Sequence, residues 1–127
     1  MAIPVRHLLD HMLIVLTRTS WDVLTTANQK SGYGVTHVAE LSSVFGTSTG
    51  QEAALIPAIQ GYWMSFIRSK NPNTYRHPGT PEWTVFGKNE TRVHFPNDPA
   101  QVGMETVDAG QHDRCQYYSD IGNMIGN

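Results

Sequence analysis

The most regular hydrophobic pattern in the chain lies between residues 51 and 69. Pro57 fits the first turn of a helix there, so we expect the helix to begin close to Ala54. It should end before the Asn71-Pro72-Asn73 turn, because proline disfavours helical geometry in the preceding residue. The segment predicts a long amphipathic helix over about residues 51–69, with a core-facing stripe at three- and four-residue steps formed by Leu55, Ile56, Ile59, Tyr62, Trp63, Phe66 and Ile67.

Weaker patterns predict elements on both sides of this helix. Residues 5–16 have a helical period, and residues 21–26 are rich in aromatic and β-branched residues, which indicates a short strand. Residues 111–125 place their apolar side chains on one helical face, which predicts a terminal helix.

A short hairpin is expected between the long helix and the terminal helix. Residues 83–86 and 92–95 alternate like two strands, and Gly87–Glu90 is suited to the turn between them. The sequence therefore predicts a hairpin at about residues 83–95, after a proline-containing surface loop over residues 70–82.

The predicted elements include too few strands for the helices that accompany them. Helical segments and a small hairpin are recognisable, but few strands remain to build a central sheet, and little is left to cover the stripe at residues 51–69. An α/β chain with these proportions is typical of a fragment of a larger domain. We therefore expect exposed apolar surface and self-association of the isolated chain.

Composition and charge narrow the classes of function. The 127 residues suffice for one domain, and a formal net charge of −2 without any Lys/Arg cluster longer than a pair excludes nucleic acid as an expected partner. No apolar run approaches the roughly 18 residues of a membrane span. Charged residues and histidines interrupt Met1–Leu16, so no signal peptide is recognisable, and the compartment stays open.

Several single residues have more than one interpretation. Cys115 is the one cysteine, so it indicates a reducing compartment, buried packing, or a bridge to a partner outside this chain. Asn89-Glu90-Thr91 is a glycosylation sequon, which matters if the protein is secreted.

His7 and His11 have the spacing of a zinc-peptidase helix, but Asp10 replaces the expected glutamate and no third ligand is evident. We expect solvated histidines and no metal site; the remaining histidines without motifs are expected at the surface, namely His77, His94 and His112.

Four blocks of the sequence resemble one enzyme family. Residues 34–46, G-V-T-H-V-A-E-L-S-S-V-F-G, resemble the catalytic-histidine segment of the type-B carboxylesterase and lipase family, the cholinesterase-like α/β-hydrolases that include fungal lipases. Residues 61–73 resemble the next helix of the family, with its Y-W-x-x-F core and its G/N-x-P-N turn. Residues 78–86 are similar to the proline-tryptophan strand entry of fungal members, and residues 114–118 resemble the terminal helix.

The resemblance implies a domain organisation and a fold. Residues 21–127 would be the C-terminal part of a carboxylesterase type-B domain, and residues 1–20 an unplaced, helix-like N-terminal segment. The fold class would be α/β, as a C-terminal fragment of the α/β-hydrolase fold.

The resemblance also implies roles for individual residues. His37 would be the general acid–base of a serine, acid, histidine triad, and Glu40 would support it through hydrogen bonds within the histidine loop. Val38 departs from the family pattern, because many members carry glycine after the histidine. No cofactor is implied.

Gly46-Thr47-Ser48-Thr49-Gly50 satisfies the nucleophile pattern G-x-S-x-G literally. This segment aligns with the loop after the family histidine, and Ser48 would follow His37 in the chain, which reverses the order of the hydrolase triad. We therefore interpret Ser48 as a loop residue that leads into the next helix.

The family's nucleophile motif, oxyanion-hole glycines and triad acid have no counterpart in this sequence. The chain is therefore expected to act on a carboxylic ester or lipid only within a complete enzyme, and to be inactive alone. The alternative hypothesis is a non-catalytic remnant that serves as a binding or structural module.

Overall fold

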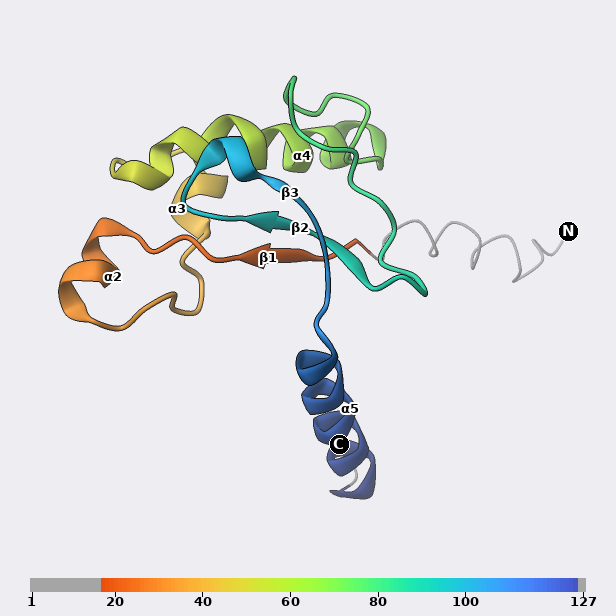
Figure 1. Cartoon of the computed structure of the whole chain (residues 1–127). Helices are drawn as coiled ribbons and strands as arrows, with labels where there is room; N and C mark the ends of the chain where they lie inside the picture. The colour runs from red at the N-terminus through yellow and green to blue at the C-terminus, as the bar shows by residue number, and fades with distance from the viewer. Residues whose placement is uncertain (1–16, 126–127) are drawn as a thin grey trace, which may run out of the picture.

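A computed structural model describes residues 17–125, so the helix predicted at residues 5–16 and the pair His7 and His11 lie outside the described residues. The chain runs through short elements, one long central helix and a terminal helix (Figure 1). In order they are β1 (Thr19–Trp21), α2 (Thr26–Ser31), α3 (Leu41–Val44), the 3-10 helix η2 (Gln51–Leu55), α4 (Ile56–Ser69), β2 (Thr91–Phe95), the 3-10 helix η3 (Pro99–Gln101), β3 (Gly103–Thr106) and α5 (Ala109–Ile125).

The three strands of the described chain form one mixed sheet in the order β1-β2-β3. β1 pairs in parallel with β2, with Trp21 opposite Phe95, and β2 pairs antiparallel with β3, with Val93 opposite Met104. Because side chains alternate across a strand, these four residues share one face of the sheet. α4 lies along that same face (Figure 1).

The hydrophobic core fills the layer between the sheet and α4. Tyr62 lies at its centre, with its ring 5.2 Å from the Trp83 ring and 6.3 Å from the Phe95 ring, both in edge-to-face geometry. Such aromatic pairs contribute about 0.5–1.5 kcal/mol beyond the burial of their surface. The remaining buried apolar residues are Val23, Leu55, Ala58, Ile59 and Val93.

The long helix has the predicted position and length. η2 covers residues 51–55, α4 begins at Ile56, and Pro57 lies in its first turn, where its missing N–H has no helical partner to lose. The helix ends at Ser69 and is capped by Lys70, which adopts a left-handed conformation with φ 58°. The prediction that the whole stripe packs in a core was wrong at Trp63 and Ile67, which are 43% and 66% exposed.

The loop after α4 is held by two polar side chains. Ser65 is fully buried, and its hydroxyl donates to the Asn71 carbonyl at 2.7 Å and accepts from the Tyr75 N–H at 2.8 Å. The Asn73 amide accepts from the Trp83 N–H at 2.7 Å and donates to the Trp83 carbonyl at 3.0 Å. These bonds fold residues 70–82 back over the helix and place Trp83 in the core.

The predicted hairpin at residues 83–95 was wrong in its first strand. Residues 83–86 belong to no strand, while the turn at residues 87–90 is present and leads into β2. β2 pairs with β1 and β3 instead. The segment before the turn contacts β2 through a 2.9 Å hydroxyl hydrogen bond between Thr84 and Thr91, and Trp83 packs in the same core as Val93 and Phe95. The strand predicted at residues 21–26 was also misplaced, because β1 ends at Trp21 and Thr25 caps the start of α2.

The terminal helix is confirmed as α5, and it projects away from the sheet (Figure 1). Its contacts with the sheet region are near its beginning, where the Gln111 side-chain oxygen accepts from Arg92 at 3.0 Å. Cys115 is exposed on this helix, so the interpretation of Cys115 as buried packing was wrong. Among residues 17–125, no helix combines the length and the apolar character that a membrane span requires.

Candidate functional site

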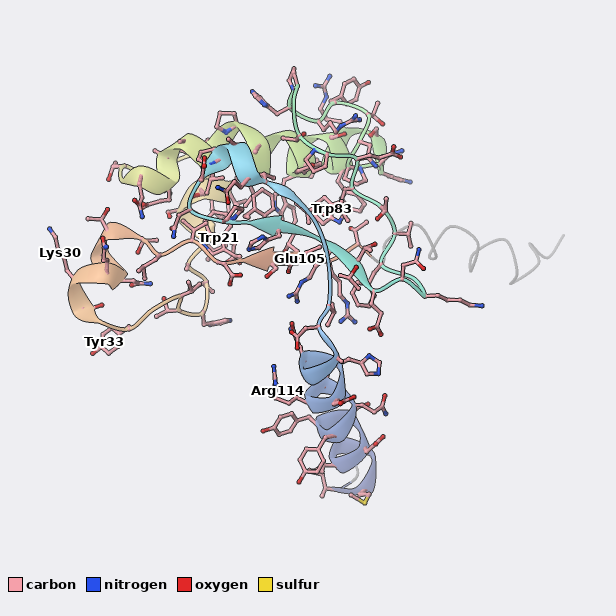
Figure 2. All side chains as sticks on the ribbon, in the orientation of Figure 1. Trp21, Lys30, Tyr33, Trp83, Glu105 and Arg114 are labelled. Atoms are coloured by element: carbon pink, nitrogen blue, oxygen red, sulfur yellow. The ribbon has the colours of Figure 1, made fainter. Side chains whose placement is uncertain are left out.

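The segment that carries His37 follows the carboxyl end of β1. α2 begins immediately after an N-cap at Thr25, whose hydroxyl accepts from the Asn28 N–H at 3.2 Å, and Gly32 ends it with φ 75°. The Asn28 side chain then donates to the Thr36 hydroxyl at 3.0 Å, which ties α2 to the residue before His37. Figure 2 shows Tyr33 projecting outward from this loop, where it is 78% exposed.

His37 lies in a tight turn between α2 and α3, and its side chain is exposed. The turn is closed by the Ala39 N–H donating to the Thr36 carbonyl at 3.2 Å and by the Leu41 N–H donating to the Val38 carbonyl at the same distance. Within residues 17–125 no serine and no carboxylate is hydrogen-bonded to the His37 ring. The imidazole is therefore presented to the outside on a backbone that fixes its position.

Val38 adopts a left-handed conformation with φ 60°. A β-branched residue is rarely found there, since its side chain crowds the following carbonyl, whereas glycine adopts this conformation without strain. The departure from the family pattern at this position thus coincides with a backbone geometry that glycine would favour.

Glu40 is half-buried at the start of α3. Its backbone carbonyl accepts from the Ser43 and Val44 N–H groups at 2.9 and 3.0 Å. Its carboxylate forms no hydrogen bond within the part of the chain that the structure describes. The supporting role of Glu40 through its side chain stays a prediction.

Ser48 lies in the loop between α3 and η2, half-buried in a cluster of three serines. Its hydroxyl donates to the Ser42 hydroxyl at 2.8 Å and shares a 2.9 Å hydrogen bond with the fully buried Ser43 hydroxyl. The described residues offer no histidine as a hydrogen-bond partner of Ser48. The hydroxyl stabilises the loop after the histidine turn.

A charged network on the open face of the sheet was not found by sequence reasoning. His94 on β2 lies 3.0 Å from the Asp22 carboxylate and 3.6 Å from that of Glu105, which accepts from Arg92 at 2.6 Å. Strand register produces this cluster, and register was not predictable without knowing that β1, β2 and β3 are neighbours. Its groups connect the three strands, and it contains no nucleophile.

The other two histidines among residues 17–125 are in surface positions, whereas the side chain of His94, also expected at the surface, is 26% exposed. His77 is exposed in the loop after α4, and His112 is half-exposed on α5 with its ring 2.9 Å from the Glu90 carboxylate. Among the residues that the structure describes, no group of three histidine, cysteine or acidic side chains could hold a metal ion.

Two comparisons with known proteins give matches. The chain is 27% identical over 104 residues to Secreted lipase 4 of Gibberella zeae, and this match covers 80% of the chain and 18% of the lipase. Its structure matches the crystal structure of EstA from Aspergillus niger with a TM-score of 0.76 and 27% identity, over 89% of this chain and 23% of the EstA chain. No family model matches the sequence.

The fold and the two matches define the class of this chain. It is an α/β chain whose described part has a small mixed sheet of three strands and four α-helices. It is related to the fungal lipases and esterases and corresponds to a C-terminal segment of that family. The resemblance read from the sequence is thereby confirmed. The chain spans less than a quarter of the length of either relative.

Proposed function

We propose that this chain is the segment of a serine ester hydrolase that supplies the triad histidine, His37. Its nucleophile and acid would lie in a part of the enzyme outside this sequence. The observation that carries the proposal is the position of His37, exposed on a backbone-fixed turn after a β-strand, in a chain related to fungal lipases and esterases. The substrate would be a carboxylic ester or lipid. We further propose that the complete protein is secreted, as the name of the Gibberella zeae relative says of that protein.

In this function the His37 imidazole works as a proton carrier. It would accept the proton of the serine hydroxyl as that oxygen attacks the ester carbonyl, and then donate it to the departing alcohol. The same exchange with water would release the acid product. An imidazole suits both steps, because its ordinary pKa of about 6.5 permits either protonation state near neutral pH. Residues 21–127 would form the C-terminal part of the catalytic domain, in the manner of an α/β-hydrolase.

The geometry of the sheet supports the proposal that the rest of the hydrolase lies next to β1. Within residues 17–125, β1 is an edge strand in parallel pairing, and parallel strands are usually covered by further structure. An apolar hollow of about 210 Å³ lies between β1 and α4, next to the exposed Trp63. Its lining consists of Thr17, Thr19, Tyr62, Trp63, Phe66, Pro72 and Trp83. The remainder of the hydrolase would pair with β1 and cover this hollow.

The proposed role of Glu40 is to hold the histidine loop in the complete enzyme. Glu40 is a half-buried residue at the end of the turn that carries His37, and its carboxylate forms no hydrogen bond among residues 17–125. Because this carboxylate has no partner among the described residues, it could accept a hydrogen bond from a donor in the rest of the enzyme, and such a bond would stabilise the loop.

A chimeric enzyme tests the proposal. The matching segment of Aspergillus niger EstA is replaced by residues 17–125, and hydrolysis of p-nitrophenyl butyrate is measured for the chimera and for the isolated chain. We expect turnover by the chimera only. His37→Ala should lower the turnover of the chimera by about a million-fold, as the loss of a triad histidine does in serine hydrolases.

His77→Ala is the matched control, since His77 is also an exposed loop histidine but lies in no family motif. It should leave turnover unchanged. The proposal fails if His37→Ala and His77→Ala are equally active, or if the isolated chain shows turnover that a serine-directed inhibitor abolishes. A folded chimera without activity would favour the alternative function, a non-catalytic binding or structural module.

A further inference from the structure

We propose that Asn89 is an attachment site for an N-linked oligosaccharide when the polypeptide containing this segment enters the secretory pathway. Asn89-Glu90-Thr91 is the one Asn-X-Ser/Thr triplet in the 127 residues, and its middle residue is not proline. This triplet is the acceptor sequence for N-glycosylation, and such sites lie on protein surfaces. The proposal does not depend on the ester-hydrolase assignment.

The structure places Asn89 where a bulky group fits. It is exposed in the turn at residues 87–90, which is closed by the Glu90 N–H donating to the Gly87 carbonyl at 3.3 Å. No hydrogen bond of the Asn89 side-chain amide is present among residues 17–125. A glycan on this nitrogen would therefore break no internal contact of the described chain.

The neighbours of Asn89, in contrast, are fixed. The Glu90 carbonyl accepts from the Val107 N–H at 3.0 Å, and the Glu90 carboxylate contacts the His112 ring at 2.9 Å. The Thr91 hydroxyl forms a 2.9 Å hydrogen bond with the Thr84 hydroxyl. Asn89 thus lies in a turn immediately before two anchored residues, so the glycan would project from a fixed base.

Strand direction separates this site from the histidine turn. β1 and β2 are parallel, the turn with Asn89 precedes β2, and the segment with His37 follows β1. The two sites therefore lie beyond opposite ends of the strands, as Figure 1 shows for the turn before β2 and for α2. A glycan on Asn89 would not obstruct a substrate at His37.

The modification transfers a glycosyl group. The Asn89 side-chain nitrogen forms a bond to the first carbon of an oligosaccharide carried on a lipid pyrophosphate, and the bond from that carbon to the pyrophosphate oxygen breaks. The amide nitrogen loses one proton, and the lipid pyrophosphate leaves. The lipid-linked oligosaccharide of the secretory pathway is the required co-reactant.

The test is expression of the full 127-residue chain behind a cleavable secretion leader in a yeast host. The protein is analysed by gel mobility and intact mass before and after treatment with peptide-N-glycosidase F. A tag with its own sequon, removable by a protease, reports whether the host glycosylates the chain. We expect the tag-free chain to lose mass on treatment and to carry aspartate in place of Asn89 afterwards, since this enzyme converts the glycosylated asparagine to aspartate.

Matched variants assign the site. Asn89→Gln and Thr91→Ala should abolish the mass change, while Thr91→Ser, which keeps the hydroxyl, should preserve it. The analysis uses the membrane fraction as well as the medium, so a variant that folds poorly and is retained still gives a result. An unmodified Asn89 in molecules whose tag sequon is glycosylated would overturn the proposal.

Discussion

Val38 combines a β-branched side chain with a left-handed backbone in the turn that presents His37. A left-handed conformation costs a non-glycine residue about 1–2 kcal/mol. The side chain of Val38 is half-exposed, so it returns little of this free energy through packing. The histidine turn therefore contains strain that a single substitution can remove.

We expect Val38→Gly to raise the free energy of unfolding by up to about 1 kcal/mol, because relief of strain exceeds the added freedom of the unfolded chain. Urea denaturation followed by circular dichroism measures the change. Val35→Gly is the control, since Val35 is similarly exposed and has no positive φ, so it should lower stability. Equal destabilisation by both substitutions would contradict the assignment of strain to Val38.

Ionisation of Tyr62 makes the stability of the chain decrease at alkaline pH. Its burial in the core raises the pKa of the phenol above the ordinary value of 10.0, while contacts with Thr80 and Arg76 act in the opposite direction. The unfolded chain therefore ionises first as the pH rises. Stability linked to Tyr62 is fully present below pH 10.0 and is lost as the pH rises from there toward the higher pKa of the folded state.

We expect the melting temperature of the wild-type chain to fall more steeply above pH 10.0 than that of Tyr62→Phe. Below that pH the variant should be less stable by about 1 kcal/mol, because it lacks the hydrogen bond that the Tyr62 hydroxyl donates to the Pro81 carbonyl. Thermal scans at several alkaline pH values measure both effects. Parallel pH profiles for the two proteins would refute the role of Tyr62.

At the scale of elements, Asn73 fastens the loop after α4 to the core. Its amide satisfies both the N–H and the carbonyl of Trp83. Asn73→Ala should lower the free energy of unfolding by about 1–3 kcal/mol, since it leaves two backbone groups of a buried residue without their partner. Thr74→Ala, at an exposed neighbouring position, should change it by less than about 0.5 kcal/mol. Chemical denaturation measures the free energy of unfolding of the two variants. Similar decreases for both would argue against the stabilising role of the Asn73 side chain.

The elements predictable from the sequence are those determined by local pattern. α4 follows from apolar spacing and from Pro57 in its first turn, and α5 from the helical spacing of a few apolar residues between 111 and 125. The pairing of β2 was not predictable, because its neighbours β1 and β3 are selected by tertiary packing and the adjacent segment 83–86 has the same alternation. Trp83 does not enter a strand, because its backbone is hydrogen-bonded to the Asn73 side chain and its own side chain packs in the core.

The residues of the candidate site also differ in whether the sequence alone could predict them. The segment around His37 was recognisable because its residue types follow a family motif, which is a local property. The network of Asp22, His94, Glu105 and Arg92 was not recognisable, since it depends on strand register. Figure 2 shows Glu105 of this network on the sheet.

At the scale of the whole molecule, the described chain exposes much apolar surface. Phe45 and Ile67 are 74% and 66% exposed, and Trp63 lies beside the hollow at β1. Contiguous apolar surface promotes association and dye binding. The relatives are several times longer, so further structure is available in them to cover such a surface.

We expect the isolated chain to bind the dye ANS strongly and to self-associate in size-exclusion chromatography with light scattering. Ile67→Lys should reduce both, whereas Thr74→Lys, which adds the same charge at an exposed polar position, should not. A sharply melting monomer with little dye fluorescence would contradict this expectation.

The pairing of β1 with β2 also has a consequence for synthesis on the ribosome. Asp22 and His94 meet across these strands although 72 residues separate them in sequence. Translation adds roughly 5–20 residues per second, so β1 is made some seconds before β2. Closure of so long a loop is slow, and during this interval β1 lacks the neighbour that β2 provides. Ribosome pausing between the codons for Asp22 and His94 would lengthen the time for which β1 lacks this neighbour.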